Sequence, residues 1–224
     1  IDVRDCLTLG SVDPVELPKE KVRKRAFDII SQILNSSLNI LHELTTRYQG
    51  IDFEQWSEQD QEKFKCLARL VDSIAMQIYL ASGAFDERRS GLQQSSKTPL
   101  SFEAKCRFFK EASFILDGLS TINFPSVVHR SLETLTFFVD IEPEEIFLRV
   151  GRVVRTGKSG NYEYEFQGDE LIVKFIERFL AEFRYILRDS EECRRVLIET
   201  LDTFVQAGWL GARRLTYRLE EIFR

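Results

Sequence analysis

The sequence has few of the residues that metal sites and many catalytic sites require. Only two histidines and four cysteines occur among its 224 residues. His42 and His129 cannot form the zinc-protease pair, because the position four residues after His42 is Thr46. The cysteines show no metal-binding or redox spacing: Cys6, Cys66, Cys106 and Cys193. We therefore expect free thiols, no metal and no cofactor.

Long apolar runs and a secretory signal pattern are also missing. No segment approaches the roughly 20 apolar residues of a membrane span, so we expect a cytoplasmic protein without a membrane partner. A net charge of −5 argues against a surface that attracts nucleic acid as a whole. The chain begins with Ile1, and its only methionine is Met76. We therefore expect a piece of a longer polypeptide.

Phenylalanine is abundant, with 18 residues, and it is concentrated in helical patterns. The clearest pattern is the segment 169–187, which predicts one amphipathic helix around which the other helices pack. Its apolar residues recur at steps of three and four: Ile172, Phe175, Ile176, Phe179, Leu180, Phe183 and Ile186. Burying each large side chain is worth roughly 1.5–3 kcal/mol, so other helices must cover this stripe.

The first part of the chain predicts a long antiparallel helical hairpin. Residues 19–49 form its first helix, which ends at Gly50, and Ser57 caps a second helix that continues to about Ala81. The predicted buried stripe of the first helix has nine members: Val22, Ala26, Ile29, Ile30, Ile33, Leu34, Leu38, Leu41 and Leu44. These residues recur at steps of three and four or lie next to one another, as on one side of a continuous α-helix.

The chain is expected to be all-α and to divide into three parts. Residues 1–83 are a leader and the hairpin, and residues 84–100, polar and without a period, predict a mobile loop. Residues 101–224 predict a stacked helical array similar to an α-solenoid, with one interruption. In that interruption, Tyr162, Tyr164 and Phe166 alternate with glutamates, which is typical of a short extended arm.

The second half resembles HEAT and armadillo-type helical repeats in its pairs of helices and tight turns. The turns that carry this resemblance are residues 140–143 and 188–190. The tail is also similar to the C-terminal helical regions of large bacterial ATP-binding signalling proteins. This second resemblance implies a sensor or scaffold role outside a nucleotide site.

Two motifs suggest chemistry that their context does not support. Gly157, Lys158 and Ser159 look like the end of a phosphate-binding loop, but the upstream glycine is Gly151, one residue out of place, and a helix leads into the motif. A helix C-terminus followed by a turn explains it better. The acidic group Glu142, Glu144 and Glu145 lies at a helix start, where negative charge compensates the helix dipole without any catalytic role.

A row of cations is the candidate binding site. Arg149, Arg152, Arg155 and Lys158 lie about three residues apart on one predicted helix, which leads into Tyr162 and Tyr164. Cations next to exposed aromatic rings can bind acidic peptides or stack on nucleotides. Cations near a helix C-terminus are also favourable without a ligand. Two more basic clusters, residues 19–25 and 213–218, are typical of solvated helix faces.

These observations favour a non-enzymatic protein-interaction, regulatory or scaffold module, with a protein partner or another domain of the same polypeptide bound between helices. Two alternatives stay open. One is a helical repeat that binds nucleic acid through the arginine row, or the sensor region of a signal-transducing nucleoside triphosphatase. The other is an enzyme whose site no motif reveals.

Overall fold

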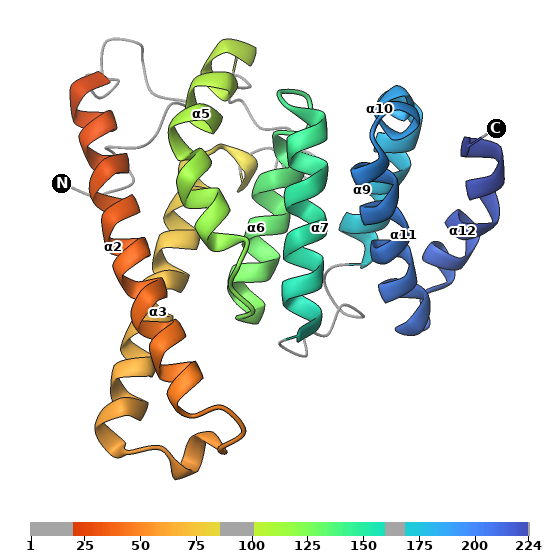
Figure 1. Cartoon of the computed structure of the whole chain (residues 1–224). Helices are drawn as coiled ribbons and strands as arrows, with labels where there is room; N and C mark the ends of the chain where they lie inside the picture. Colours follow the sequence, from red (N-terminus) through yellow and green to blue (C-terminus); the bar gives the residue numbers. More distant parts are fainter. Residues whose placement is uncertain (1–19, 86–100, 160–168, 224) are drawn as a thin grey trace. The chain divides into compact units, whose positions relative to one another are not determined.

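The computed structural model describes residues 20–85, 101–159 and 169–223, and it confirms the all-α prediction (Figure 1). The described residues contain no strand. The helices are α2 (Glu20–Arg47), α3 (Glu58–Ala81), α5 (Phe102–Leu119), α6 (Pro125–Phe137), α7 (Pro143–Ser159), α9 (Asp169–Glu182), α10 (Arg184–Asp189), α11 (Glu191–Gln206) and α12 (Leu210–Phe223), with a short 3-10 helix at Phe53–Gln55. None of these helices is long and apolar enough to cross a membrane.

Several sequence predictions lie outside the described residues. They include the leader, all of the expected loop except Ala84 and Phe85, and the expected extended arm at 162–166. Ala84 is buried. The contacts divide the chain into one unit through Leu119 and a second from Ser120. This division differs from the boundary expected at 84–100, because α5 packs against α2 and so belongs to the first unit.

The first unit contains α2, α3 and α5. Gly50 follows α2 with φ +77°, the left-handed conformation that glycine accepts without strain. Ser57 then begins α3, since its Oγ accepts a hydrogen bond from the Asp60 N–H at 3.2 Å. Helices α2 and α3 pack against each other as the expected hairpin. The end of the hairpin that contains the turn extends beyond α5 (Figure 1).

The buried stripe of α2 differs from the predicted one. The buried residues are spaced alternately by four and three: Arg23, Phe27, Ile30, Leu34, Ser37, Leu41 and Leu44. Val22, Ile29 and Ile33 were predicted to be buried, but they are 48%, 42% and 40% exposed. The reason is geometric: these three residues lie about a quarter of a turn from the stripe that α3 and α5 cover.

Helix α5 is fixed to α2 by three different contacts. The rings of Phe27 and Phe108 meet edge to face, with centroids 5.4 Å apart. Arg23 is buried and forms a two-pronged ion pair with Glu111, with distances of 2.6 and 2.9 Å. That hydrogen bond raises the pKa of the Arg23 guanidinium. Gly118 lies where an added Cβ would be 3.0 Å from Leu34 Cδ2, so the two helices approach closely there.

The second unit is an array of helices in which α7 packs between α6 and α11. Helix α9 contacts α6 and α12, and α12 also contacts α11 (Figure 1). Phe179 is completely buried, and its ring centroid lies 4.2 Å from that of Phe147 and 6.0 Å from that of Phe175. Of the phenylalanines in the predicted stripe, Phe175 and Phe179 are therefore in the core, and Phe183 is half-buried.

The predicted helix 169–187 is interrupted. Phe183 has φ −120° and ψ 24°, outside the helical range, and it separates α9 from α10. Its N–H still donates to the Phe179 carbonyl at 2.9 Å, whereas its own carbonyl accepts from the Ile186 N–H, only three residues on. The chain thus changes direction within one turn, a feature that the apolar period does not encode.

Gly151 of α7 lies at a close approach to Val196 of α11. A Cβ added at Gly151 would overlap Val196 Cγ1. Alanine normally stabilises a helix interior relative to glycine by about 0.8–1.0 kcal/mol. Here we expect Gly151→Ala to lower the free energy of unfolding by about 1–3 kcal/mol because the helices must separate. Chemical denaturation measures this loss.

Val196→Ala removes the overlapping atom and provides the specific check. The double variant Gly151→Ala/Val196→Ala should lose less stability than the sum of its single variants. Ile198→Ala, on the exposed side of α11, is the matched control and should be additive with Gly151→Ala. A gain in stability for Gly151→Ala alone would contradict the close approach.

Candidate functional site

The structure places the first arginine of the predicted cationic row in the interior. Arg149 is only 3% exposed, and its Nη2 pairs with Glu145 Oε1 at 2.7 Å, one turn earlier in α7. A guanidinium buried in this way is not available to a macromolecule at the surface. The prediction that Arg149 belongs to an exposed binding row is therefore wrong.

Arg152 and Arg155 are exposed, but both interact within the second unit. Arg152 Nη1 lies 3.4 Å from Ser120 Oγ, and Arg155 Nη1 pairs with Glu199 Oε2 of α11 at 2.6 Å. The structure describes neither the Lys158 side chain nor Tyr162 and Tyr164. Their part in a binding site stays a prediction, and the described arginines do not form one continuous cationic surface.

The described histidines and cysteines do not form a metal-binding cluster. His129 Nε2 lies 3.5 Å from Glu133 Oε1 on α6, and His42 is exposed on α2. Cys66, Cys106 and Cys193 are free thiols, and burial raises the pKa of the Cys193 thiol. Among the residues that the structure describes, no three histidine, cysteine or carboxylate side chains are placed to hold a metal ion.

An open depression lies at the start of α11. It has a volume of about 340 Å³, and it is lined by Glu144, Tyr185, Ile186, Asp189 and Ser190. Ser190 is the N-cap of α11, because its Oγ accepts from the Cys193 N–H at 3.3 Å. The acidic lining compensates the positive end of that helix, so the depression has a structural explanation.

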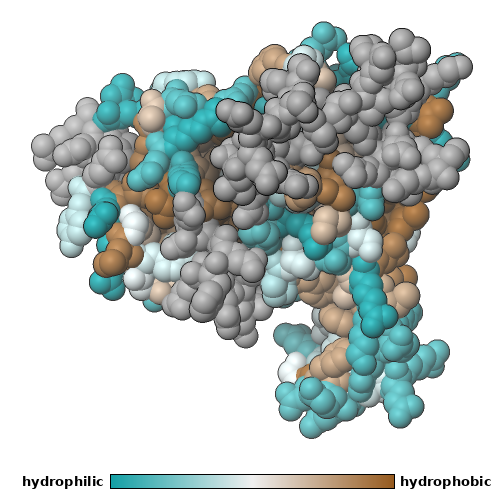
Figure 2. Space-filling view, turned by 180° about the vertical axis from the view of Figure 1, so that it is seen from behind, coloured by the Kyte–Doolittle hydropathy of each residue, from teal (hydrophilic) through white to brown (hydrophobic). Residues whose placement is uncertain are grey.

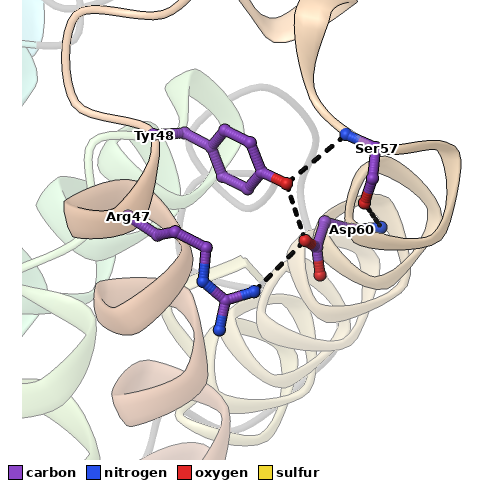
Figure 3. A network of polar contacts seen from close by, with 4 residues as sticks. All are labelled: Arg47, Tyr48, Ser57 and Asp60. Atoms are coloured by element: carbon purple, nitrogen blue, oxygen red, sulfur yellow. Dashed lines mark hydrogen bonds and ion pairs between the residues drawn. The ribbon is translucent and has the colours of Figure 1, made fainter.

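The turn of the α2–α3 hairpin contains a connected polar network (Figure 3). The Tyr48 hydroxyl donates to Asp60 Oδ2 at 2.8 Å and accepts from the Ser57 N–H at 3.4 Å. Arg47 Nη1 pairs with the same carboxylate oxygen at 3.2 Å. Asp60 therefore joins the end of α2 to the start of α3.

Aromatic rings pack next to this network. Tyr48 stacks on Trp56 with centroids 4.4 Å apart, and Phe53 and Phe64 pack against Trp56 at 5.1 and 5.4 Å. Lys65 Nζ lies 5.7 Å from the centroid of the Phe53 ring. The capping pair Ser57 and Asp60 was readable from the sequence, but the partnership with Tyr48 was not. The sequence feature that could have indicated this partnership is the number of aromatic residues close to the short turn between the two helices.

The second feature that sequence reasoning missed is an exposed apolar row on α2, formed by Val22, Ile29 and Ile33. Figure 2 shows apolar surface on the first unit next to the hydrophilic end of the hairpin. The row continues along the helix through Ala26 and Ile40, which are partly exposed. The sequence signal is that α2 has more apolar residues than a single buried stripe uses. We call these five residues the α2 row.

Comparison of the chain with protein-family models found no match. Comparisons with curated proteins and with solved structures also found no match.

The hairpin network predicts a pH dependence. The hydrogen bond from Tyr48 is the main cause that lowers the pKa of Asp60, with Ser57 and Arg47 contributing in the same direction. A lowered pKa in the folded state means that the stabilisation is present above the unfolded value of about 3.9 and is lost as pH falls through the folded value. Asp60→Asn should therefore be less stable than the native chain at pH 7, and this difference should shrink below about pH 4.

Denaturation followed by the fluorescence of Trp56, in a Trp209→Phe background, reports on this end of the hairpin. Asp52→Asn is the control, because Asp52 lies in the same turn and its side chain makes no capping hydrogen bond. The difference in the free energy of unfolding between Asp52→Asn and the parent should not change over the same pH range. An Asp60→Asn difference that stays constant from pH 7 to pH 3 would show that the carboxylate does not stabilise the turn.

Proposed function

We propose that this chain is a protein-interaction module and that the α2 row binds an amphipathic helix of another polypeptide. The observation that carries the proposal is the exposure of Val22, Ile29 and Ile33 on one side of a long, packed helix. Isolated exposed apolar residues are ordinary on protein surfaces, but an aligned set is typical of a docking face.

The spacing of the α2 row supports a helical partner. Successive members are separated by four, three, four and seven residues, which is the spacing of one side of a helix pair. The neighbouring stripe of α2 is already occupied by α3 and α5 in this way. A further helix laid against the α2 row would extend the same packing, with β-branched side chains as its anchors.

The edges of the row are polar on the side away from the core. Lys24, Arg25, Asp28 and Gln32 are all exposed there. An apolar centre with a polar rim is the usual composition of a non-obligate interface. This arrangement supports reversible binding, as expected of a regulatory or scaffold module, and it requires no catalytic group.

The nucleic-acid alternative has less support. It required Arg149, Arg152 and Arg155 to form one surface, but Arg149 is buried and Arg155 pairs with Glu199. A sensor role in a signal-transducing protein is compatible with a helix-binding face, and it remains a more specific version of the proposal.

Photo-crosslinking tests the proposal in the cells that express the protein. A benzoylphenylalanine placed at position 29 or 33 should form adducts with another polypeptide, and peptide mapping should place the crosslinked residue in an amphipathic helix. The same group at Asn35, which is exposed on the polar side of α2, is the matched control. Ile33→Lys should remove the adduct formed from position 29 while leaving the melting temperature within a few degrees, because Ile33 is already exposed.

Three results would contradict the proposal: equal adducts from positions 29 and 35, adducts formed only within the same chain, or adducts only between two copies of it. The second result would mean that the chain itself covers the row.

A further inference from the structure

The outer face of α12 combines apolar and cationic side chains. Leu210 and Tyr217 are 70% and 83% exposed, and Arg213 and Arg214 between them are also exposed. The spacing of three, one and three residues places all four on adjacent positions of one helix side. We call these four residues the α12 face.

Helix α12 is firmly packed on its other side, so this exposure does not come from loose attachment. Trp209 stacks on Phe204 of α11 with centroids 4.3 Å apart. Ala212 and Leu215 are buried, and a Cβ added at Gly211 would lie 3.2 Å from Val173 Cγ2 of α9. The α12 face is therefore presented by a helix whose position is fixed within the second unit.

The two arginines of the α12 face differ from those of α7. Among the residues that the structure describes, neither Arg213 nor Arg214 forms an ion pair, whereas Arg149 and Arg155 of α7 each pair with a carboxylate. Two adjacent guanidinium groups that form no ion pair with the described side chains create a local positive potential on a chain of net charge −5. Such a site is complementary to carboxylates on another molecule.

Leu210, the aliphatic member of the α12 face, indicates which class of molecule the face binds. Tyrosine and arginine suit both proteins and nucleic acids, because both can stack on bases or pair with anions. Leu210, which is 70% exposed, offers no stacking surface and is stabilised only by another apolar group. The combination favours a protein segment over a nucleic acid.

We propose that the α12 face binds an acidic segment of a protein partner, with carboxylates on Arg213 and Arg214 and an apolar side chain between Leu210 and Tyr217. Arginine, tyrosine and a central apolar contact are the residues that dominate protein interfaces. This proposal does not depend on the α2 row, which lies in the other unit and carries a different chemistry.

The experiment uses a displayed library of random peptides selected against the complete 224-residue chain. Enriched peptides should combine aspartate or glutamate with a large apolar residue. A synthetic copy of the most enriched peptide should bind less tightly as salt increases. Arg213→Glu/Arg214→Glu should weaken its binding by at least about tenfold, and Tyr217→Ala should weaken it as well.

Lys63→Glu/Arg69→Glu is the matched control, because it reverses two exposed cations on α3, outside both proposed binding faces, and changes the net charge by the same amount. Its affinity for the peptide should stay within about twofold of the native value. Arg213→Gln/Arg214→Gln separates the loss of positive charge from the effect of new repulsion, and circular dichroism confirms that each variant is folded.

The proposal is wrong if no peptide is enriched, if the enriched peptides lack acidic residues, or if both charge reversals weaken binding equally. A labelled single-stranded oligonucleotide is tested in parallel. If it binds and loses binding with Arg213→Glu/Arg214→Glu, while the peptides do not bind, the face belongs to nucleic acid and the proposal is overturned.

Discussion

Close approach of helices at glycine is the constraint on which both units depend. Gly118 lies against Leu34, Gly151 against Val196 and Gly211 against Val173, in each case joining two different helices. A glycine inside a helix costs about 0.5–1 kcal/mol relative to alanine. The packing around it must therefore exceed this cost, and it does so by bringing the large side chains on either side into contact. Phe108 in the first unit and Phe179 in the second are completely buried.

The open surfaces are a consequence of the same packing. Helix α2 is apolar over more of its circumference than α3 and α5 cover, so Val22, Ile29 and Ile33 remain outside. Helix α12 is covered by α9 and α11 on one side only, which leaves Leu210 and Tyr217 exposed. Neither surface requires strain or an irregular backbone. Each surface is exposed because other helices pack against only one side of α2 or α12.

Much of the fold could be predicted from the sequence, because helix ends and buried stripes are local patterns. Gly50, Ser57 and the stripe through Phe179 were predicted correctly for that reason. The failures concern information that is not local. The period of α2 shows that Ile33 and Leu34 are both candidates for the core, but only the positions of α3 and α5 decide that Leu34 is inside. The interruption at Phe183 and the burial of Arg149 depend on neighbouring helices in the same way.

The arginines show why a basic cluster in a sequence is a weak sign of a binding site. In α7, Glu145 lies one turn before Arg149 and Glu199 lies across the contact with α11, so the charges are neutralised within the fold. Arg213 and Arg214 have no such carboxylate among the described residues, although their cluster is shorter. Helix α11 packs against both α7 and α12, and what differs is where its carboxylates lie: Glu199 pairs with Arg155 of α7, whereas no described carboxylate pairs with Arg213 or Arg214. The sequence does not show which carboxylates the fold brings near, so a cationic surface can be identified only after the packing is known.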